Sequence, residues 1–348
     1  MQLIPASSPI LSDDIAVPLV PEHELRKANA FIASDSRFKA AARFLASIWR
    51  RDHAFPIGGV VRDGKREKLG SLISESAGRA GHNFASPAVR DLVARALIYR
   101  QRAAMYDATR LRTNLLASQT MAFNLFGPMA LDLRLASKVV QELFPGTLAE
   151  VSAVRFEYAP ARGDARFGGD FSAWDVLILG HTAAGVRGLI AIETKFTESC
   201  EESGGKPISE QFQSMVPKTG LYRDSEAAGM MSPAHRQLIR EHLMAQAVID
   251  HGMVEAGWFA VVSPYGNHLA RRAVEGYASL LQEPEGNSVP FSYRTVEEVL
   301  EALAGCGHEK YAQSLYERYL DFDRVAVELG LQSRPASATS FDALQIPV

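Results

Sequence analysis

Residues 174–197 read WDVLILGHTAAGVRGLIAIETKFT, and this stretch decides the fold. Two apolar runs rich in Val, Ile and Leu stand on either side of the short connection 181–188. The pattern predicts two strands joined as an antiparallel hairpin. Asp175 begins the first strand, and Glu193 and Lys195 lie two residues apart in the second. Because side chains alternate faces along a strand, Glu193 and Lys195 point the same way, and the hairpin brings Asp175 beside them.

These side chains are suited to binding a hard cation. The carboxylates of Asp175 and Glu193, with the main-chain carbonyl of Thr194 and water, suit Mg²⁺ or Mn²⁺. Such a cation polarises a phosphoryl oxygen and lowers the pKa of bound water, and Lys195 would orient the nucleophile or offset charge on the phosphate. An ion pair on an edge strand is the alternative for so common a triplet. A Glu and a Lys on one face of a strongly apolar strand favour the site, because buried charges are costly without partners.

The segments around the hairpin extend the pattern. Residues 151–160 (VSAVRFEYAP) and 258–264 (WFAVVSP) are predicted strands, and residues 236–252 are a predicted helix that ends at a glycine. Residues 115–144 are helical in pattern, with one helix expected to end and another to begin at Gly127–Pro128. The central order is therefore helix, three strands, helix, strand, and the rest of the chain to about residue 328 alternates helical segments.

This order, with Asp on the second strand and ExK on the third, resembles the αβββαβ core of the PD-(D/E)xK nuclease superfamily. The superfamily includes restriction endonucleases, repair nucleases and phage exonucleases. A closer similarity is to a little-characterised bacterial group of restriction-endonuclease-like proteins, over roughly residues 50 to 320. It is carried by NLLASQTMAFNLFGPMA (114–130), RFEYAP (155–160), WDVLILG (174–180), GLIAIETKFTE (188–198) and AVVSPYGN (260–267).

The resemblance implies an α/β fold with a mixed central sheet flanked by helices. It also implies that Asp175 and Glu193 ligate the metal and that Lys195 assists the nucleophile. Trp174 stands where the superfamily's name places a proline.

Many members of the superfamily add an acidic residue from the first core helix or the first strand. Glu157 is the candidate here, with Glu142 behind it. Pairing of Glu157 with Arg155 or Arg162 on a surface is an equal alternative. Gln246, on the helix after the hairpin, is a further candidate for facing the site, with a surface position as its alternative.

Charge is divided unevenly along the chain. Residues 1–115 hold 18 Lys and Arg against 11 Asp and Glu, a net +7, and the remainder carries −10, which together give −3. The division favours a basic part that grips phosphates beside an acidic part that holds divalent cations, although solvated helix faces explain it equally well. Basic helices are predicted at 37–51 and 88–106, with turns or a mobile loop at 55–83. The second helix supplies the candidate nucleic-acid contacts Arg90, Arg95, Arg100 and Arg102.

The sequence predicts four regions: an irregular arm (1–24), a basic and mainly helical region (25–112), a nuclease-like domain (113–330) and a polar tail (331–348). No stretch approaches the ~20 apolar residues of a membrane span, and the N-terminus lacks the pattern of a signal peptide. Two distant cysteines without a CxxC partner argue against disulfides and thiolate zinc sites. We therefore expect a soluble cytoplasmic protein without a membrane partner.

The function expected is a divalent-metal-dependent hydrolase that cleaves DNA phosphodiester bonds, in defence or repair. The alternative is a catalytically inactive protein with the nuclease fold that binds nucleic acid or scaffolds a complex, since fold does not fix function. The sequence leaves open whether cleavage is endo or exo and whether the substrate is single- or double-stranded. It also leaves open a protein partner or a homodimer.

Overall fold

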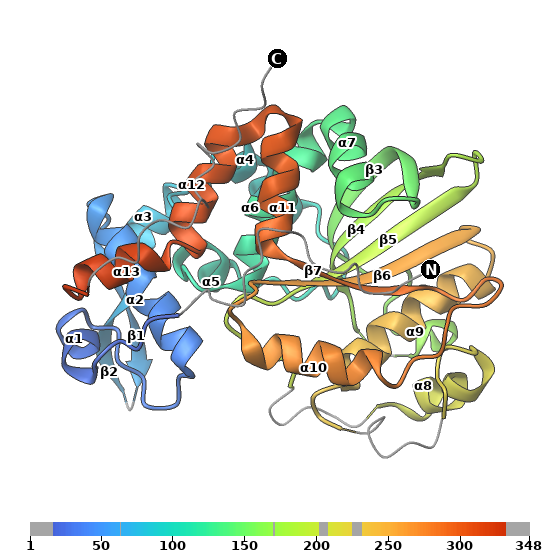
Figure 1. Ribbon diagram of the computed structural model, residues 1–348, viewed down its shortest axis with the longest axis horizontal. Helices are drawn as coiled ribbons and strands as arrows, with labels where there is room; N and C mark the ends of the chain where they lie inside the picture. The colour runs from blue at the N-terminus through green and yellow to red at the C-terminus, as the bar shows by residue number, and fades with distance from the viewer. Residues whose placement is uncertain (1–16, 63, 170, 202–207, 225–231, 332–348) are drawn as a thin grey trace.

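A mixed five-stranded sheet forms the centre of the computed structural model, which describes residues 17–62, 64–169, 171–201, 208–224 and 232–331 (Figure 1). The strand order is β3-β4-β5-β6-β7. Strand β4 is antiparallel to both of its neighbours, β3 and β5, whereas β6 and β7 run parallel to β5. This confirms the predicted α/β fold with a mixed sheet. The strands are β3 (Leu148–Tyr158), β4 (Trp174–Thr182), β5 (Arg187–Thr194), β6 (Ala256–Ser263) and β7 (Phe291–Thr295).

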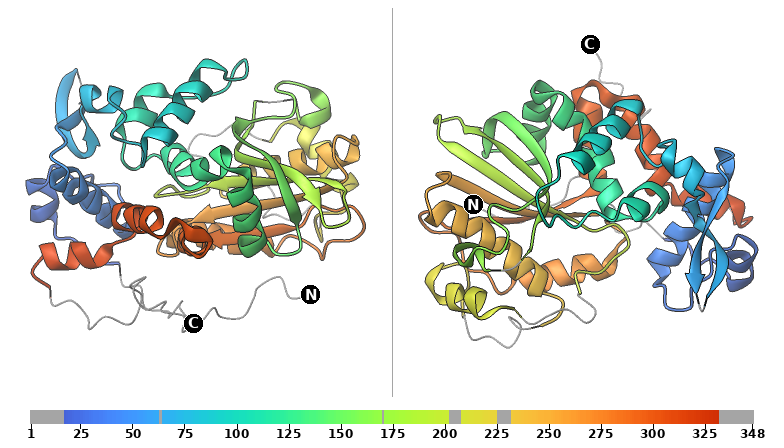
Figure 2. Two further views of the ribbon diagram at one scale, coloured as in Figure 1. Left: turned by 90° about the horizontal axis from the view of Figure 1, so that it is seen from above. Right: turned by 180° about the vertical axis from the view of Figure 1, so that it is seen from behind.

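Helices cover both faces of the sheet, because β5 is apolar on both sides. Ile190 and Ile192 belong to one buried cluster, whereas Leu189 and Ala191 belong to another on the opposite face. The first cluster includes residues of α6 (Ser118–Leu131), α7 (Leu133–Leu143), α11 (Val296–Leu303) and α12 (Glu309–Tyr319). The second includes residues of α8 (Glu210–Met215), α9 (Arg236–Asp250) and α10 (His268–Ala278), and Figure 2 shows the resulting layers.

Helix α6 continues through Pro128, so the predicted break at Gly127–Pro128 is wrong. Proline lacks the N–H that would bond the carbonyl four residues earlier. That carbonyl, on Asn124, accepts a hydrogen bond of 2.7 Å from the Tyr311 hydroxyl instead. The chain turns only at Asp132, whose side chain accepts from the N–H groups of Arg134 and Leu135 and caps α7.

The N-terminal region contains α1 (Glu22–Lys27), α2 (Arg37–Asp52), α3 (Glu75–Arg79), α4 (Pro87–Ile98) and α5 (Ala108–Thr113). It also contains an antiparallel hairpin, β1 (Ile57–Arg62) and β2 (Lys65–Ile73), where the sequence predicted turns or a mobile loop. Gly64, with φ of +73°, provides the left-handed turn that joins these strands. The predicted helix 88–106 is also too long, because α4 ends at Ile98.

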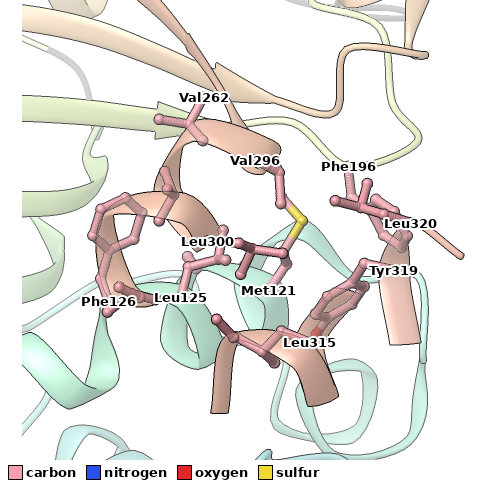
Figure 3. Packing of buried hydrophobic residues seen from close by; sticks show 14 of the residues in the cluster. Met121, Leu125, Phe126, Phe196, Val262, Val296, Leu300, Leu315, Tyr319 and Leu320 are labelled. Atoms are coloured by element: carbon pink, nitrogen blue, oxygen red, sulfur yellow. The ribbon is translucent and has the colours of Figure 1, made fainter. Parts of the chain in front are cut away.

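The C-terminal helices α12 and α13 (Phe322–Glu328) return to the N-terminal region. The rings of Phe38 on α2 and Phe322 on α13 meet edge to face with their centres 5.6 Å apart. Figure 3 shows Leu315, Tyr319 and Leu320 packing beside Met121 of α6 and beside Phe196, which follows β5 closely. One buried cluster thus joins both ends of the described chain to the sheet.

Other short elements are the 3-10 turns Ala165–Phe167 and Val216–Lys218 and the π-helical turn Ala304–His308. Strand β7 is a further correction, because only helical segments were expected after β6. Most of the predicted arm (1–24) and nearly all of the tail (331–348) lie outside the described residues, and the division into domains stays a prediction. Among the helices that the structure describes, none is long and apolar enough to cross a membrane.

Candidate active site

Three acidic residues lie in one row across the neighbouring strands β3, β4 and β5. The register pairs Phe156 with Val176 and Tyr158 with Trp174, which places Glu157 opposite Asp175. On the other side, Val176 pairs with Ile192, so the next position along places Glu193 opposite Asp175. Like charges directly opposite each other destabilise a sheet. The row therefore calls for a compensating cation.

Thr194 fixes the orientation of Asp175. Its backbone N–H and its hydroxyl both donate to Oδ2 of Asp175, at 2.9 and 2.6 Å. The Thr194 hydroxyl also lies 3.5 Å from the carbonyl oxygen of Ser118, the first residue of α6. Thr194 thus contributes through its donors, and the role of its carbonyl as a metal ligand stays a prediction.

Lys195 is held in a buried network between β5 and α9. Its Nζ lies 2.9 Å from Oε1 of Glu193 and donates to Oε1 of Gln237 at 2.6 Å. The amide of Gln237 donates in turn to Glu193 and to Glu241, at 2.7 and 2.8 Å. Glu193, Lys195 and Glu241 are 4%, 8% and 2% exposed, so the network is largely removed from solvent. The ion pair of the alternative interpretation is formed, but its expected place on an edge strand is wrong, because β5 is the middle strand of the sheet.

Acidic groups outnumber the single cation in this network, and burial changes their pKa values. Burial raises the pKa of Glu193 to about 7, with a further contribution from the charge of Asp175. Burial and the charge of Glu193 raise the pKa of Glu241 well above its ordinary value. Burial alone would lower the pKa of Lys195, but the carboxylate of Glu193 outweighs it, so the pKa is raised and the ammonium keeps its proton. Lys195 is therefore a cation and not a general base at neutral pH.

Glu157 is held in an unusual backbone conformation at the end of β3. Its φ is +49°, in the left-handed region that non-glycine residues rarely occupy. Arg162 donates to the Glu157 carbonyl at 2.7 Å, and the Gln119 amide donates to its carboxylate. Burial and the charge of Asp175 raise the pKa of the Glu157 carboxyl to about 8. Such strain is typical of residues that a functional site holds in place.

A family model described as the PD-(D/E)XK nuclease superfamily matches residues 33–321. The chain belongs to this superfamily. The resemblance seen in the sequence is therefore confirmed, and it supports a nuclease-type function. No curated protein matches the chain, and no solved structure matches it.

Superfamily nucleases generally use divalent metal ions, and the residues present fit such an ion. Within the described residues, Oδ1 of Asp175 and Oε2 of both Glu193 and Glu157 accept no hydrogen bond, so each carboxylate keeps an oxygen for a ligand. Among all the residues that the structure describes, no group of three His, Cys, Asp or Glu side chains could hold a metal ion without other ligands. Mg²⁺ needs no such group, because it usually retains water and binds through one or two carboxylates plus substrate phosphate.

The other predicted residues of this nuclease-fold chain lie in different places. Gln246 bonds Asp250 and the backbone at Asn287 and Val289, so it braces the approach to β7, buried but on another side of α9. It lies nine residues after Gln237, about half a turn round the helix and some 13 Å along it. The surface alternative for Gln246 is thus also wrong, because it is only 3% exposed.

Glu142 is exposed on α7, so Glu157 is the acidic residue that meets the site. The alternative for Glu157 was a surface ion pair with Arg155 or Arg162. Within the described residues this pair is not formed, because Arg162 bonds the carbonyl of Glu157 and not its carboxylate. The nucleic-acid candidates Arg90 and Arg95 are exposed on α4, and Arg100 and Arg102 are exposed in the loop that follows it. Their contact with nucleic acid stays a prediction.

Sequence reasoning missed Gln237 and Glu241. Both lie one turn apart on α9, and this spacing of polar residues inside an apolar helix is the signal that could have identified them. It also missed that Trp174, which replaces the superfamily's proline, donates from its indole to the Glu241 carbonyl at 3.0 Å. The substitution anchors β4 to α9 beside Asp175.

Proposed function

We propose that the protein is a divalent-metal-dependent nuclease that hydrolyses phosphodiester bonds of DNA. The observation that supports this most directly is the row of Glu157, Asp175 and Glu193, with Lys195 as the ammonium beside it. Four buried or partly buried carboxyl groups, including Glu241, stand against this one ammonium. Burial and mutual repulsion make it costly to ionise all four, and a bound cation would offset that cost.

Each side chain has a chemical role. Asp175 and Glu193 would hold the metal, with Glu157 as a further ligand reached directly or through water. The metal, when bound, supplies Lewis acidity toward the phosphate and a lowered pKa for a coordinated water. Lys195, fixed by Glu193 and Gln237, presents a positive charge to the attacking water or to the phosphate oxygens as charge develops there. Thr194 keeps Asp175 from rotating away.

The test is cleavage of supercoiled plasmid and of linear single-stranded DNA by the purified full chain. Mg²⁺ or Mn²⁺ is supplied, with an EDTA control. We expect metal-dependent cleavage that falls by about a hundred-fold or more in Asp175→Asn and in Glu193→Gln, the size of effect seen when one preorganised electrostatic contact is removed. Glu255→Gln is the matched control, because Glu255 is an exposed carboxylate whose partner is Arg187. It should cleave like the wild type.

A separate measurement guards against loss by unfolding. Thermal unfolding of each variant is followed with and without Mn²⁺, because a ligand that binds only the folded state stabilises it by about 2.7 kcal/mol at a hundred times its Kd. Folded variants without the metal-induced shift and without cleavage support the proposal. Equal cleavage by wild type, Asp175→Asn and Glu193→Gln would reject it.

The second candidate is a nuclease-fold protein that binds nucleic acid or scaffolds a complex without cutting. It is favoured by the exposed arginines Arg90, Arg95, Arg100 and Arg102 on and after α4, which can contact phosphates without any hydrolysis. Nucleic-acid binding by folded wild-type protein with no cleavage in either metal would support this candidate over the first.

A further inference from the structure

Residues 98–112 run from the last residue of α4 into α5, and they are attached to the strand that carries Glu157. We refer to them as the α4–α5 segment. The side-chain amide of Gln101 exchanges two hydrogen bonds of 3.1 Å with the backbone of Ala159. The Tyr106 hydroxyl donates to the carbonyl of Phe156 at 3.1 Å. These bonds lie on either side of Glu157, so the segment is fixed at the edge of the candidate active site.

The other end of the α4–α5 segment is attached just beyond Lys195. Arg110 donates to Oε1 of Glu198 at 2.9 Å. The other oxygen of Glu198 accepts from the N–H groups of Phe196 and Thr197, at 3.2 and 3.0 Å. The segment therefore extends from the strand of Glu157 to the turn that follows Lys195, and a substrate at the site would meet it.

Around its attachment at Gln101 the segment exposes large apolar side chains. Tyr99, Met105 and Ile98 are 82%, 76% and 74% exposed, and among the large apolar residues that the structure describes only Val61, at 74%, equals any of them. Single exposed apolar residues are ordinary, but three in eight residues beside an active site indicate an interaction surface. These three side chains do not contribute to the buried core of the described chain.

The charge of the segment indicates the partner. Its residues 98–112 contain four arginines and a single acid, Asp107. Asp107 is already used, because its carboxylate accepts from the N–H groups of Thr109 and Arg110 and caps α5. Arg100 and Arg102 are exposed on either side of the Gln101 anchor, next to Tyr99. An aromatic ring flanked by arginines matches a nucleic-acid strand, whose phosphates attract the arginines and whose bases stack on the ring.

We propose that the α4–α5 segment holds a substrate strand with unpaired bases, with Tyr99 stacked on one base and Arg100 and Arg102 on the neighbouring phosphates. The inference deepens the proposed nuclease function and rests on it. Bases inside a duplex are already stacked on each other and leave no face for Tyr99. The chain should therefore prefer single-stranded nucleic acid, or a junction with unpaired nucleotides, over blunt duplex.

The test is binding measured by fluorescence anisotropy in EDTA, where no metal-dependent cleavage takes place. The probes are a labelled oligothymidine, an abasic oligonucleotide of the same length and a blunt hairpin duplex. We expect the wild type to bind oligothymidine most tightly. Tyr99→Ala should weaken that binding about ten-fold, the loss expected from one stacked base, and leave abasic binding unchanged. Tyr99→Phe, which keeps the ring, should bind like the wild type.

Two further variants test the phosphate contact and provide a control. Arg102→Gln should weaken the oligothymidine and abasic probes alike and reduce the salt dependence of binding. Val327→Ala is the matched control, since Val327 is 56% exposed on α13, and it should change nothing. The proposal would be overturned if Tyr99→Ala bound oligothymidine as tightly as the wild type, or if it lost as much affinity for the abasic probe as for oligothymidine. Duplex binding by the wild type as tight as its single-strand binding would also overturn it.

This assay is independent of catalysis. Wild-type protein that cuts DNA, together with Tyr99→Ala that binds normally, would refute the strand contact and leave the nuclease function intact. Wild-type protein that does not cut, together with the expected Tyr99 pattern, would refute hydrolysis and support the strand contact.

Discussion

Two buried charged clusters in this protein differ in how their charges are balanced. In the N-terminal region, Arg43 is only 7% exposed, and its guanidinium contacts both oxygens of Asp35, at 2.6 and 3.2 Å. Its remaining nitrogen donates to the Ser71 hydroxyl at 2.7 Å. Lys39 lies 3.8 Å from the same carboxylate, so the anion is fully matched by cations. The pair of Arg43 and Asp35 holds α2 against β2 and the turn before α2.

At the candidate active site the balance is different. Lys195 faces Glu193, with Glu157, Asp175 and Glu241 around them, and Oε2 of Glu241 is buried without a hydrogen bond. Leaving a buried acceptor unpaired costs about 1–3 kcal/mol. The comparison separates a charge cluster that stabilises the fold from one that lowers its stability in favour of binding a cation.

The largest stability difference should come from removing one acid from each cluster. Asp35→Ala leaves Arg43 buried without its anion, and we expect the free energy of unfolding to fall by about 3 kcal/mol. Glu241→Gln puts a neutral amide where burial already raises the pKa of the carboxyl well above its ordinary value, and we expect the metal-free protein to be as stable as the wild type or more so. Urea unfolding in EDTA measures both. A larger loss in Glu241→Gln than in Asp35→Ala would contradict the comparison.

The pH dependence should separate the clusters further. Burial raises the pKa of Glu193 to about 7 and that of Glu157 to about 8, above the ordinary value of about 4.3 for Glu in an unfolded chain. The folded state thus binds more protons in this window, so the stability of the metal-free protein should fall as pH rises from about 5 to about 8. Each group changes the free energy by at most about 1.4 kcal/mol per pH unit.

Two measurements check this sign. Urea unfolding at several pH values should show a weaker decline in Glu193→Gln than in the wild type. Metal affinity should change in the opposite direction and rise with pH, because the ligands must lose their protons first. Parallel pH dependence in wild type and Glu193→Gln would show that this carboxyl does not titrate in the window.

The smallest effect concerns the strained backbone at the site. Glu157→Gly and Glu157→Ala both remove the carboxylate, but only glycine adopts a φ of +49° without cost. We expect the glycine variant to be more stable than the alanine variant by about 1 kcal/mol, although both should lose cleavage to a similar extent. Equal stability of the two variants would show that the left-handed conformation is not strained.

The sequence predicts the central hairpin and its three candidate site residues because the strand period of two is a local property. Asp175, Glu193 and Lys195 follow from that period together with an apolar strand that contains charges. Gln237 and Glu241 could not be placed in the same way, because which side of α9 meets β5 depends on the long crossover to β6. The choice of Gln246 shows the consequence, since it lies on the correct helix but on another side.

Other errors also arise where distant contacts decide the outcome. The Gly127–Pro128 pair predicts a helix end, yet Tyr311, far along the chain, bonds the carbonyl that the proline leaves free. The five-residue strand β7 is too short to show a period by itself, and it forms because β6 offers it an edge. The β1–β2 hairpin, in contrast, carried a local signal, because Asp-Gly between two runs is typical of a tight turn.

The contact between α2 and the helices α12 and α13 has a consequence for how the protein is made. Helix α2 leaves the ribosome well before its partners, among them Phe322 and Arg324, which lie far along the chain. Until then the apolar face of α2 lacks its cover, and exposed faces of this kind are sites where chaperones and proteases act. We therefore expect that chains ending before α12 fail to fold stably and are degraded.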